Sequence, residues 1–130
     1  MGKIVEVLLQ KKDLISGITV SMEEISQAEQ MLNVRFAKDY VEYLKAFGFA
    51  CYDGHELTGL CKAKRLNVVD VTLKEKTYIN NLPVGAYVIE EAHIDDIVIW
   101  QVQDGGVYQS NGNHSFVKIF DNLCQYIEMK

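Results

Sequence analysis

Four carboxylates surround one short stretch of the sequence and form its clearest chemical group. They flank residues 92–94 and consist of Glu90, Glu91, Asp95 and Asp96. Such a group can dock lysine and arginine side chains of a protein partner, or it can belong to an ordinary solvated loop between strands. A Ca²⁺ or Mg²⁺ site is a third alternative, but the stretch lacks the alternating oxygen ligands and fixed glycine of a calcium-binding loop. These residues by themselves leave both the docking patch and the solvated loop open.

A second candidate surface surrounds Gly54. Tyr52, Asp53 and Glu56 supply an aromatic ring and two carboxylates there. The sequence predicts a mobile loop, and loop residues of these types often anchor protein interfaces, although a simple turn is the alternative. We expect these three residues to contact the partner as well.

Catalysis would depend on Cys51 and His55, which are four residues apart and could act as nucleophile and base, with His93 or His114 recruited from elsewhere. No oxyanion glycine signature or recognisable orienting residue accompanies them. The three cysteines and three histidines also lack the close paired spacing of structural zinc ligands. The sequence therefore favours a protein that is not an enzyme and has no catalytic residues, metal or cofactor.

The charge is unevenly distributed along the chain. The 130 residues include 18 Asp or Glu and 13 Lys or Arg, giving a formal net charge of −5. Residues 1–65 carry nine of each sign, so the whole excess lies in residues 66–130, and no Lys or Arg occurs between Thr77 and Val117. Such a field repels phosphate backbones and attracts cationic protein surfaces. We expect a protein partner and no direct binding of nucleic acid.

The length, with no linker or repeat, predicts a single domain over residues 1–130. Three cysteines without a CxxC pair cannot pair completely within the chain, which indicates a reducing compartment. The N-terminal apolar run is interrupted by Glu6 and is too short for a signal peptide or a membrane span. We expect a cytoplasmic protein with no membrane contact.

Helical patterns dominate the first 48 residues. One amphipathic helix is expected over Lys3–Ile15, and a second begins after Ser21, whose hydroxyl can form a capping box with Glu24. A third runs from about Lys38 to Gly48, with the glycine as a left-handed terminator.

Turn residues then divide the remaining sequence into short β-prone runs. The expected elements are a strand at 57–60, a short helical or irregular stretch at 71–78, strands at 86–90 and 97–103, and a hairpin through 104–106 into a return strand at 107–109. A closing helix spans Phe116–Ile127 after a Ser115 cap.

These elements predict an α+β domain in which helices at both ends of the chain pack on one face of a twisted, mainly antiparallel sheet, while the other face stays open. In the second long strand, Val98, Trp100 and Val102 alternate as the expected core face. Tyr87 and Tyr108, on neighbouring strands, are candidates for exposed aromatic contacts.

A series of short motifs extends over nearly the whole chain. In sequence order they are Ile25–Glu29, Phe36–Tyr40, Tyr43-Leu44, Phe47-Gly48, His55–Gly59, Val68–Thr72, Tyr87–Glu91, Gly105–Tyr108 and the closing segment with Phe116. Their order and spacing resemble the SUKH superfamily, cytoplasmic immunity proteins of bacterial polymorphic toxin systems that are related to a yeast cell-wall regulator. One departure is Ala37, where the family often has proline, but alanine costs little in a first helical turn.

The resemblance implies a SUKH-like fold and an immunity protein that binds and neutralises a cognate secreted toxin domain. Many such toxins are nucleases with basic active-site surfaces, which an acidic inhibitor would attract in place of nucleic-acid phosphates. The resemblance therefore favours a docking patch at Glu90, Glu91, Asp95 and Asp96 over a solvated loop. The alternative is an intracellular protein-interaction scaffold or regulator of the same fold. The sequence predicts no particular oligomeric state.

Overall fold

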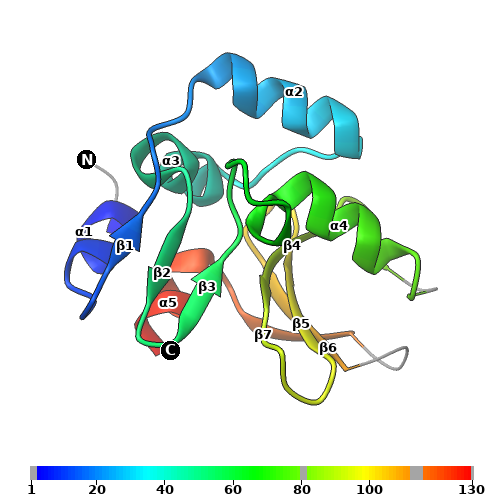
Figure 1. The fold of residues 1–130 in the computed structure, drawn as a ribbon. Coiled ribbons are helices and arrows are strands. Elements are labelled where there is room, and N and C mark those ends of the chain that lie inside the picture. The colour runs from blue at the N-terminus through cyan, green and yellow to red at the C-terminus, as the bar shows by residue number, and fades with distance from the viewer. Residues whose placement is uncertain (1–2, 80–81, 112–115, 130) are drawn as a thin grey trace.

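The computed structural model describes residues 3–79, 82–111 and 116–129 (Figure 1). Within these residues the chain forms five α-helices, one short 3₁₀ helix and seven β-strands. The helices are α1 (Lys3–Leu9), α2 (Met22–Leu32), α3 (Lys38–Phe47), α4 (Val68–Lys76) and α5 (Leu123–Met129), and the 3₁₀ helix η1 is Lys64–Leu66. The strands are β1 (Ile15–Ser16), β2 (Ala50–Tyr52), β3 (His55–Leu57), β4 (Tyr87–Glu91), β5 (Ile97–Gln101), β6 (Val107–Asn111) and β7 (Phe116–Phe120).

All seven strands belong to one antiparallel sheet and follow one another across it in sequence order. The junction between β3 and β4 is narrow, because Leu57 and Glu90 are its one paired position among the described residues. The Thr58 amide adds a hydrogen bond of 2.9 Å to the Ile89 carbonyl. The sheet is therefore divided into a small part, β1–β3, and a larger part, β4–β7 (Figure 1).

Local sequence accounts for the position of α2 and α3. The Ser21 hydroxyl accepts a hydrogen bond from the Glu24 amide, while the Glu24 carboxylate accepts one from the Ser21 amide, so the predicted capping box is confirmed. The predicted third helix is also confirmed, and it ends at Gly48, whose φ is +73°. Glycine is required there because an added Cβ would collide with the carbonyl of Ile18.

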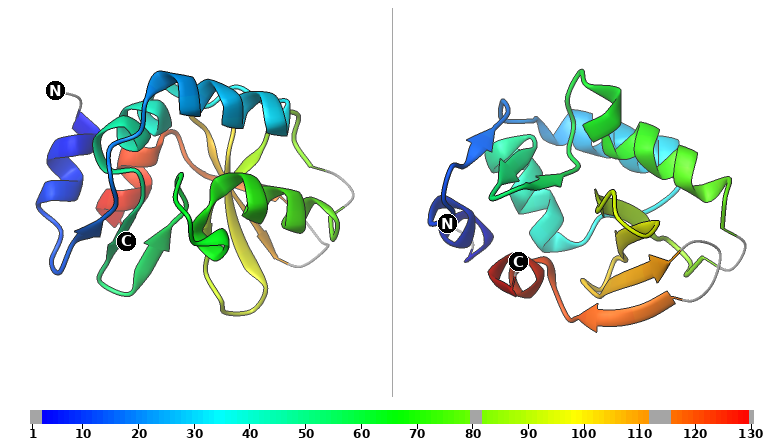
Figure 2. Two further views of the ribbon diagram at one scale, coloured as in Figure 1. Left: turned by 45° about the horizontal axis from the view of Figure 1, so that its top comes forward. Right: turned by 60° about the horizontal axis from the view of Figure 1, so that its bottom comes forward.

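Helices from the two ends of the chain cover the same face of the sheet, as the sequence predicts. α1 and α5 lie side by side (Figures 1 and 2), and the Lys3 ammonium is 3.8 Å from a Glu128 carboxylate oxygen. Together with α2 and α3 they enclose the main hydrophobic core. Its fully buried members include Ile4, Leu8, Ile25, Leu44, Leu57, Ile89 and Ile127.

The opposite face of β4 and β5 is covered by α4. Val88, Val98 and Trp100 form a second buried cluster with Val71 of this helix. The expectation of an open face is therefore wrong, because the connection between β3 and β4 carries a nine-residue helix back across the sheet. Trp100 is buried, as predicted, and its indole N–H donates to the Ser110 hydroxyl at 2.9 Å.

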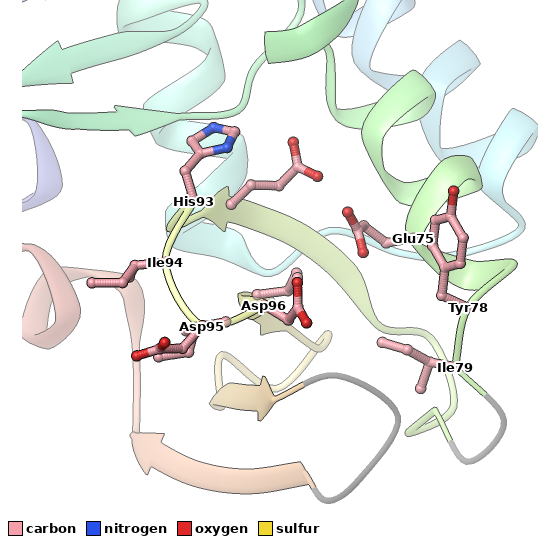
Figure 3. Close-up of a pocket in the computed structure, with 10 residues that line it drawn as sticks. Glu75, Tyr78, Ile79, His93, Ile94, Asp95 and Asp96 are labelled. Carbon is pink, nitrogen blue, oxygen red and sulfur yellow. The ribbon is translucent and has the colours of Figure 1, made fainter.

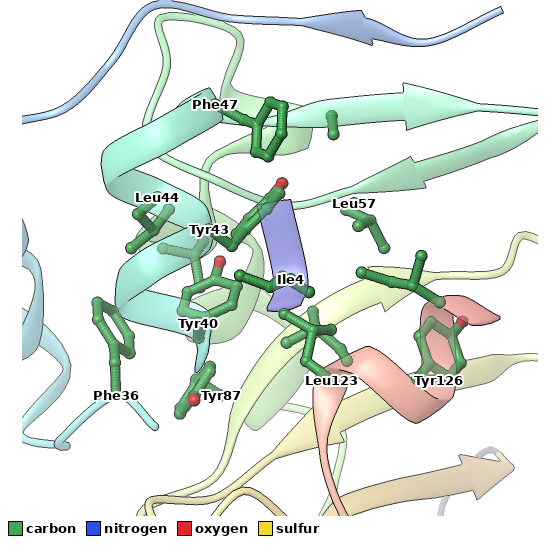
Figure 4. Packing of buried hydrophobic residues seen from close by; sticks show 14 of the residues in the cluster. Ile4, Phe36, Tyr40, Tyr43, Leu44, Phe47, Leu57, Tyr87, Leu123 and Tyr126 are labelled. Atoms are coloured by element: carbon green, nitrogen blue, oxygen red, sulfur yellow. The ribbon is translucent and has the colours of Figure 1, made fainter. Parts of the chain in front are cut away.

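Tyrosine rings from α3 and β4 meet in the main core (Figure 4). Tyr40 packs against Tyr43 and Tyr87, with ring centroids 5.3 and 5.0 Å apart. The Tyr43 hydroxyl donates to the Thr58 carbonyl at 2.6 Å, and the Tyr87 hydroxyl donates to the Gln101 side-chain oxygen at 2.7 Å. Because Tyr87 is fully buried, the prediction that it forms an exposed contact is wrong.

The N-terminal helix is shorter than predicted. α1 ends at Leu9, and Ile15 and Ser16 pair with β2 as an edge strand. The strand predicted at residues 57–60 begins and ends earlier in the sequence, as β3 (His55–Leu57). The strand before it, β2, was not predicted. Both differences arise because short segments gain their strand hydrogen bonds only from a neighbour in the fold.

The predicted closing helix begins too early. Phe116–Phe120 is β7, paired with β6, and α5 starts at Leu123. A short apolar run fits either a helix or a strand by spacing alone, and here pairing with β6 decides in favour of the strand. The Asn122 side chain accepts a hydrogen bond from the Gln125 amide at 2.9 Å and so caps α5. The predicted Ser115 cap lies outside the described residues.

Candidate partner-binding surface

A groove of about 620 Å³ opens between the end of α4 and the connection from β4 to β5. Glu75, Tyr78 and Ile79 border it on the side of α4, and residues 93–96 border it on the other side (Figure 3). The remaining lining residues are Glu91, Ile97 and Val98. This α4–β5 groove therefore combines carboxylates with apolar side chains.

The β4–β5 connection holds two of the predicted docking residues at the surface. His93, Asp95 and Asp96 have φ angles of 58°, 52° and 56°, a left-handed backbone that Asp and His adopt more readily than most residues. The Ala92 amide donates to the Ile97 carbonyl at 3.1 Å and closes the connection. Asp95 and Asp96 are exposed. Asp96 points toward α4 across the groove, whereas Asp95 points away from it (Figure 3).

Glu75 and Glu91 form a largely buried carboxyl pair in the groove, with side chains 15% and 11% exposed. Burial, a hydrogen bond to Glu91 and the charge of Glu91 raise the pKa of Glu75 to about 7. Burial acts against ionisation of Glu91 too, but hydrogen bonds from Glu75 and Lys74 outweigh it and lower the pKa of Glu91. The Lys74 ammonium is 2.7 Å from Glu91 Oε2. The pair therefore holds one proton until the pH approaches neutrality.

Glu90 faces the core and not the solvent. Its side chain is 5% exposed, and its carboxylate accepts hydrogen bonds from the Glu56 amide at 3.1 Å and from the Tyr126 hydroxyl, with His55 Nδ1 also 3.1 Å away. The carboxylate thus joins β3, β4 and α5 at the narrow junction of the sheet. The prediction that Glu90 belongs to an exposed patch is wrong, because the strand register shifts between Val88 and Glu90 and the residue turns inward.

Tyr52 is also buried, and the segment around Gly54 is a tight hairpin between β2 and β3. Tyr52 pairs with His55 across the turn and is 1% exposed. Its ring centroid lies 5.3 Å from that of His55 and 5.2 Å from the Lys11 ammonium. The prediction of a direct partner contact through Tyr52 is therefore wrong, because strand pairing turns its ring into the core.

The other two predicted residues of this hairpin are accessible to different degrees. Asp53 is exposed at the turn, with a φ of 46°. Glu56 is partly buried, and its carboxylate accepts a hydrogen bond from the Arg65 guanidinium at 2.7 Å. This hydrogen bond holds the pKa of Glu56 below its ordinary value. Asp53 is thus the more exposed carboxylate of the hairpin.

Cys51 and His55 point to opposite faces of the sheet, because Cys51 pairs with Glu56 whereas His55 pairs with Tyr52. Burial and the negative charge of Glu56 raise the pKa of the Cys51 thiol, which opposes formation of the reactive thiolate. Across residues 3–79, 82–111 and 116–129, no group of three or more His, Cys, Asp or Glu side chains could hold a metal ion. His114, the other candidate base, lies outside the described residues.

Sequence reasoning did not find the contribution of α4 to this surface. Glu75, Tyr78 and Ile79 are far from the β4–β5 connection in sequence, and only the packing of α4 on the sheet brings them to it. The one sequence feature that could have indicated it is Tyr78, an aromatic residue just after a helical segment. In the structure its side chain is 67% exposed.

The chain is thus an α+β domain with a sequentially ordered antiparallel sheet and a groove lined by carboxylates. A SUKH family model described as SMI1-KNR4 cell-wall matches residues 1–130, so the chain belongs to this family. Domains of the family act in protein–protein interactions, and membership is compatible with an immunity role. No curated protein matches the chain significantly. Among the described helices, none has the length and apolar character needed to cross a membrane.

Proposed function

We propose that this chain is an immunity protein that binds a cognate secreted toxin domain in the cytoplasm and blocks it without catalysing a reaction. The observation that carries this proposal is the pair of exposed carboxylates, Asp95 and Asp96, at the α4–β5 groove, which the largely buried Glu91 also lines. It belongs to a stretch without Lys or Arg between Thr77 and Val117. Membership of the SUKH family supports the same role.

An acidic surface suits a toxin whose active site is basic, as in a nuclease. Opposite potentials on two proteins speed their encounter and disfavour wrong partners. Asp95 and Asp96 are exposed on a closed connection, so they can meet a partner without rearrangement of the sheet. Their carboxylates would take the places of nucleic-acid phosphates and cover the substrate-binding surface of the toxin.

The proposed direct contacts are Glu91, Asp95 and Asp96, with Asp53 and Glu56 at the β2–β3 hairpin. Glu90 and Tyr52 support this surface from within, since both are buried against the elements that carry it. Changes at these two buried residues would therefore act through the fold, whereas changes at Asp95 and Asp96 would act on the partner.

The test is co-expression with candidate toxin domains encoded immediately upstream of this gene, followed by measurement of cell survival and of affinity for the toxin that is neutralised. We expect the double variant Asp95→Asn/Asp96→Asn to bind about tenfold more weakly or worse. The matched control is Glu6→Gln/Asp13→Asn, which also removes two exposed charges; Asp13 has a φ of 58°, close to those of Asp95 and Asp96.

Survival with the wild-type chain and loss of affinity in the Asp95/Asp96 variant alone would support the proposal. If no upstream toxin is neutralised and the chain binds a protein of its own cell instead, it acts as a scaffold or regulator. Equal loss in both variants would show that net charge matters and that the position of the patch does not.

A further inference from the structure

We propose that the α4–β5 groove receives one arginine side chain of the protein partner, whose guanidinium binds the carboxyl groups of Glu75, Glu91 and Asp96 that line it. The inference rests on the proposed function, since it specifies the chemistry by which a basic toxin surface would be held. Binding of arginine to the groove can nevertheless be measured without any toxin, so its failure is distinguishable from failure of the proposed function.

The size and lining of the groove fit a long cationic side chain. Pockets that hold small ligands have volumes of roughly 300–1,000 Å³, and the groove has about 620 Å³. Ile79 and Val98 offer apolar surface to the methylene groups of such a side chain. The Tyr78 ring, 67% exposed at the border, offers a face on which a guanidinium can stack.

Charge complementarity selects arginine among long side chains. Its planar guanidinium donates in two parallel directions and suits paired carboxylate oxygens, whereas the compact lysine ammonium is more strongly hydrated. Glu75 and Glu91 lie together, and Asp96 points toward them from the opposite border (Figure 3). A guanidinium between these three carboxylates would have acceptors on both sides.

The raised pKa of Glu75 means that its charged form is disfavoured beside Glu91. Two carboxylates in one largely buried site cannot both ionise at little cost, and this pair responds by keeping a proton on Glu75 with a pKa of about 7. A bound guanidinium brings its own positive charge, so Glu75 would release its proton to the solvent. Binding of arginine and loss of this proton are then linked.

The titratable groups that line or adjoin the groove around Glu75 bear on this linkage. Those on the described residues around the groove are Lys74 and Tyr78 from α4, Glu91 from β4, and His93, Asp95 and Asp96 from the connection. Lys74 is the basic group already at the pair: its half-exposed ammonium lies 2.7 Å from Glu91 Oε2 and 3.7 Å from Glu75 Oε2. A carboxylate can accept about four hydrogen bonds, so Lys74 does not saturate the pair.

The experiment is an NMR titration of the full chain with Nα-acetyl-L-arginine N-methylamide at pH 6 and pH 8. The matching citrulline amide, a neutral isostere, is the control ligand. We expect saturable shifts at Glu75, Glu91 and the β4–β5 connection with the arginine compound alone. Affinity should be about tenfold weaker at pH 6, because only about a tenth of Glu75 is ionised one unit below a pKa of about 7.

Variants distinguish the groove from general attraction. Glu75→Gln keeps a donor toward Glu91 but cannot ionise, so it should remove the pH dependence. Asp96→Asn should weaken binding several-fold, while Asp13→Asn, which removes the same charge from an exposed residue of similar φ (58°) outside the groove, should leave it unchanged. If Glu75→Gln fails to fold, the comparison of Asp13→Asn with Asp96→Asn still decides the question.

The proposal is overturned if no saturable shift occurs, if the citrulline compound binds equally, or if Asp13→Asn and Asp96→Asn weaken binding to the same extent. Persistence of the pH dependence in folded Glu75→Gln would also overturn it. Binding of the arginine compound by a chain that protects against no toxin would support the groove and contradict the immunity role. Protection by a chain that does not bind the compound would do the reverse.

Discussion

Replacing Glu90 by alanine removes the carboxylate that joins three elements of the fold. The Glu56 amide and the Tyr126 hydroxyl would lose their acceptor, and His55 Nδ1 would lose a carboxylate 3.1 Å away. Tyr126 is 2% exposed, so water cannot readily replace the lost partner. Among the described residues, Leu57 and Glu90 are also the one paired position between β3 and β4, so the change falls at this junction.

The expected loss of stability follows from these contacts. Each buried polar group left unpaired costs about 1–3 kcal/mol, and two such groups arise here. Part of this is offset, because the variant no longer buries a charge. We expect the free energy of unfolding to fall by about 3 kcal/mol, a large part of the roughly 5–15 kcal/mol typical of a domain.

Urea unfolding monitored by the fluorescence of Trp100 measures this effect, because Trp100 is the one tryptophan of the chain and is fully buried. With a slope of about 1.5 kcal/mol per molar urea, the midpoint should fall by about 2 M. Glu90→Gln, which keeps one oxygen acceptor, should fall between wild type and Glu90→Ala. Asp96→Asn, an exposed change, should shift stability by less than about 0.5 kcal/mol.

A midpoint for Glu90→Ala no lower than that of Asp96→Asn would refute the structural role of this carboxylate. Glu90 would then again be a candidate for direct contact with a partner. The urea midpoint also helps to interpret the survival test. If a Glu90 variant with a lowered midpoint no longer protects cells from the toxin, the cause is unfolding and not a lost contact with the partner.

Three further predictions concern the pH dependence of stability, a closely packed glycine and a helix cap. Because the folded pKa of Glu75 is about 7 against an ordinary 4.5, the proton stabilises the folded state below pH 4.5, and that contribution is lost as the pH rises to 7. Stability of the wild type relative to Glu75→Gln should therefore fall across this window in urea titrations, and a constant difference would contradict it. Gly59→Ala should cost about 3 kcal/mol or more, because the new Cβ would collide with the Gly48 carbonyl; a thermal midpoint within 2 °C of wild type, about 0.5 kcal/mol, would exclude the collision. Ser21→Ala should cost about 1 kcal/mol by removing the acceptor for the Glu24 amide, which calorimetry can measure; an unchanged transition would mean that the capping box is not stabilising.

Elements whose signals are local were predictable. Ser21 and Glu24 are three residues apart, and Gly48 ends the helix that precedes it, so α2 and α3 follow from nearby residues. The β5–β6 hairpin is local in the same sense, and its predicted turn is confirmed. β7 was assigned to a helix because the apolar spacing of Phe116–Phe120 fits both structures, and only the hydrogen bonds to β6 distinguish them.

The candidate site was predictable only where exposure follows from a turn. Asp95 and Asp96 lie at the surface because polar residues in a tight connection face solvent, whereas Glu90, next to them in the predicted patch, is buried. No local signal marks the register shift that turns Glu90 inward, since it depends on the pairing of β4 with β5. Tyr52 illustrates the same limit in the β2–β3 hairpin.

The sequence by itself determined the α+β class, the motif order of the SUKH family and the acidic stretch without balancing cations. These properties reside in composition and in neighbouring residues, so they need no tertiary contact to be read. Only the tertiary structure decided which carboxylates can contact a partner. It buries Glu90 among hydrogen-bond donors, leaves Asp95 and Asp96 exposed to solvent, and brings Glu75 of α4 next to Glu91 of β4. The physical reason is that burial and the distance between charges depend on packing across the sheet, and these two quantities set whether a carboxylate binds a partner, holds a proton or supports the fold.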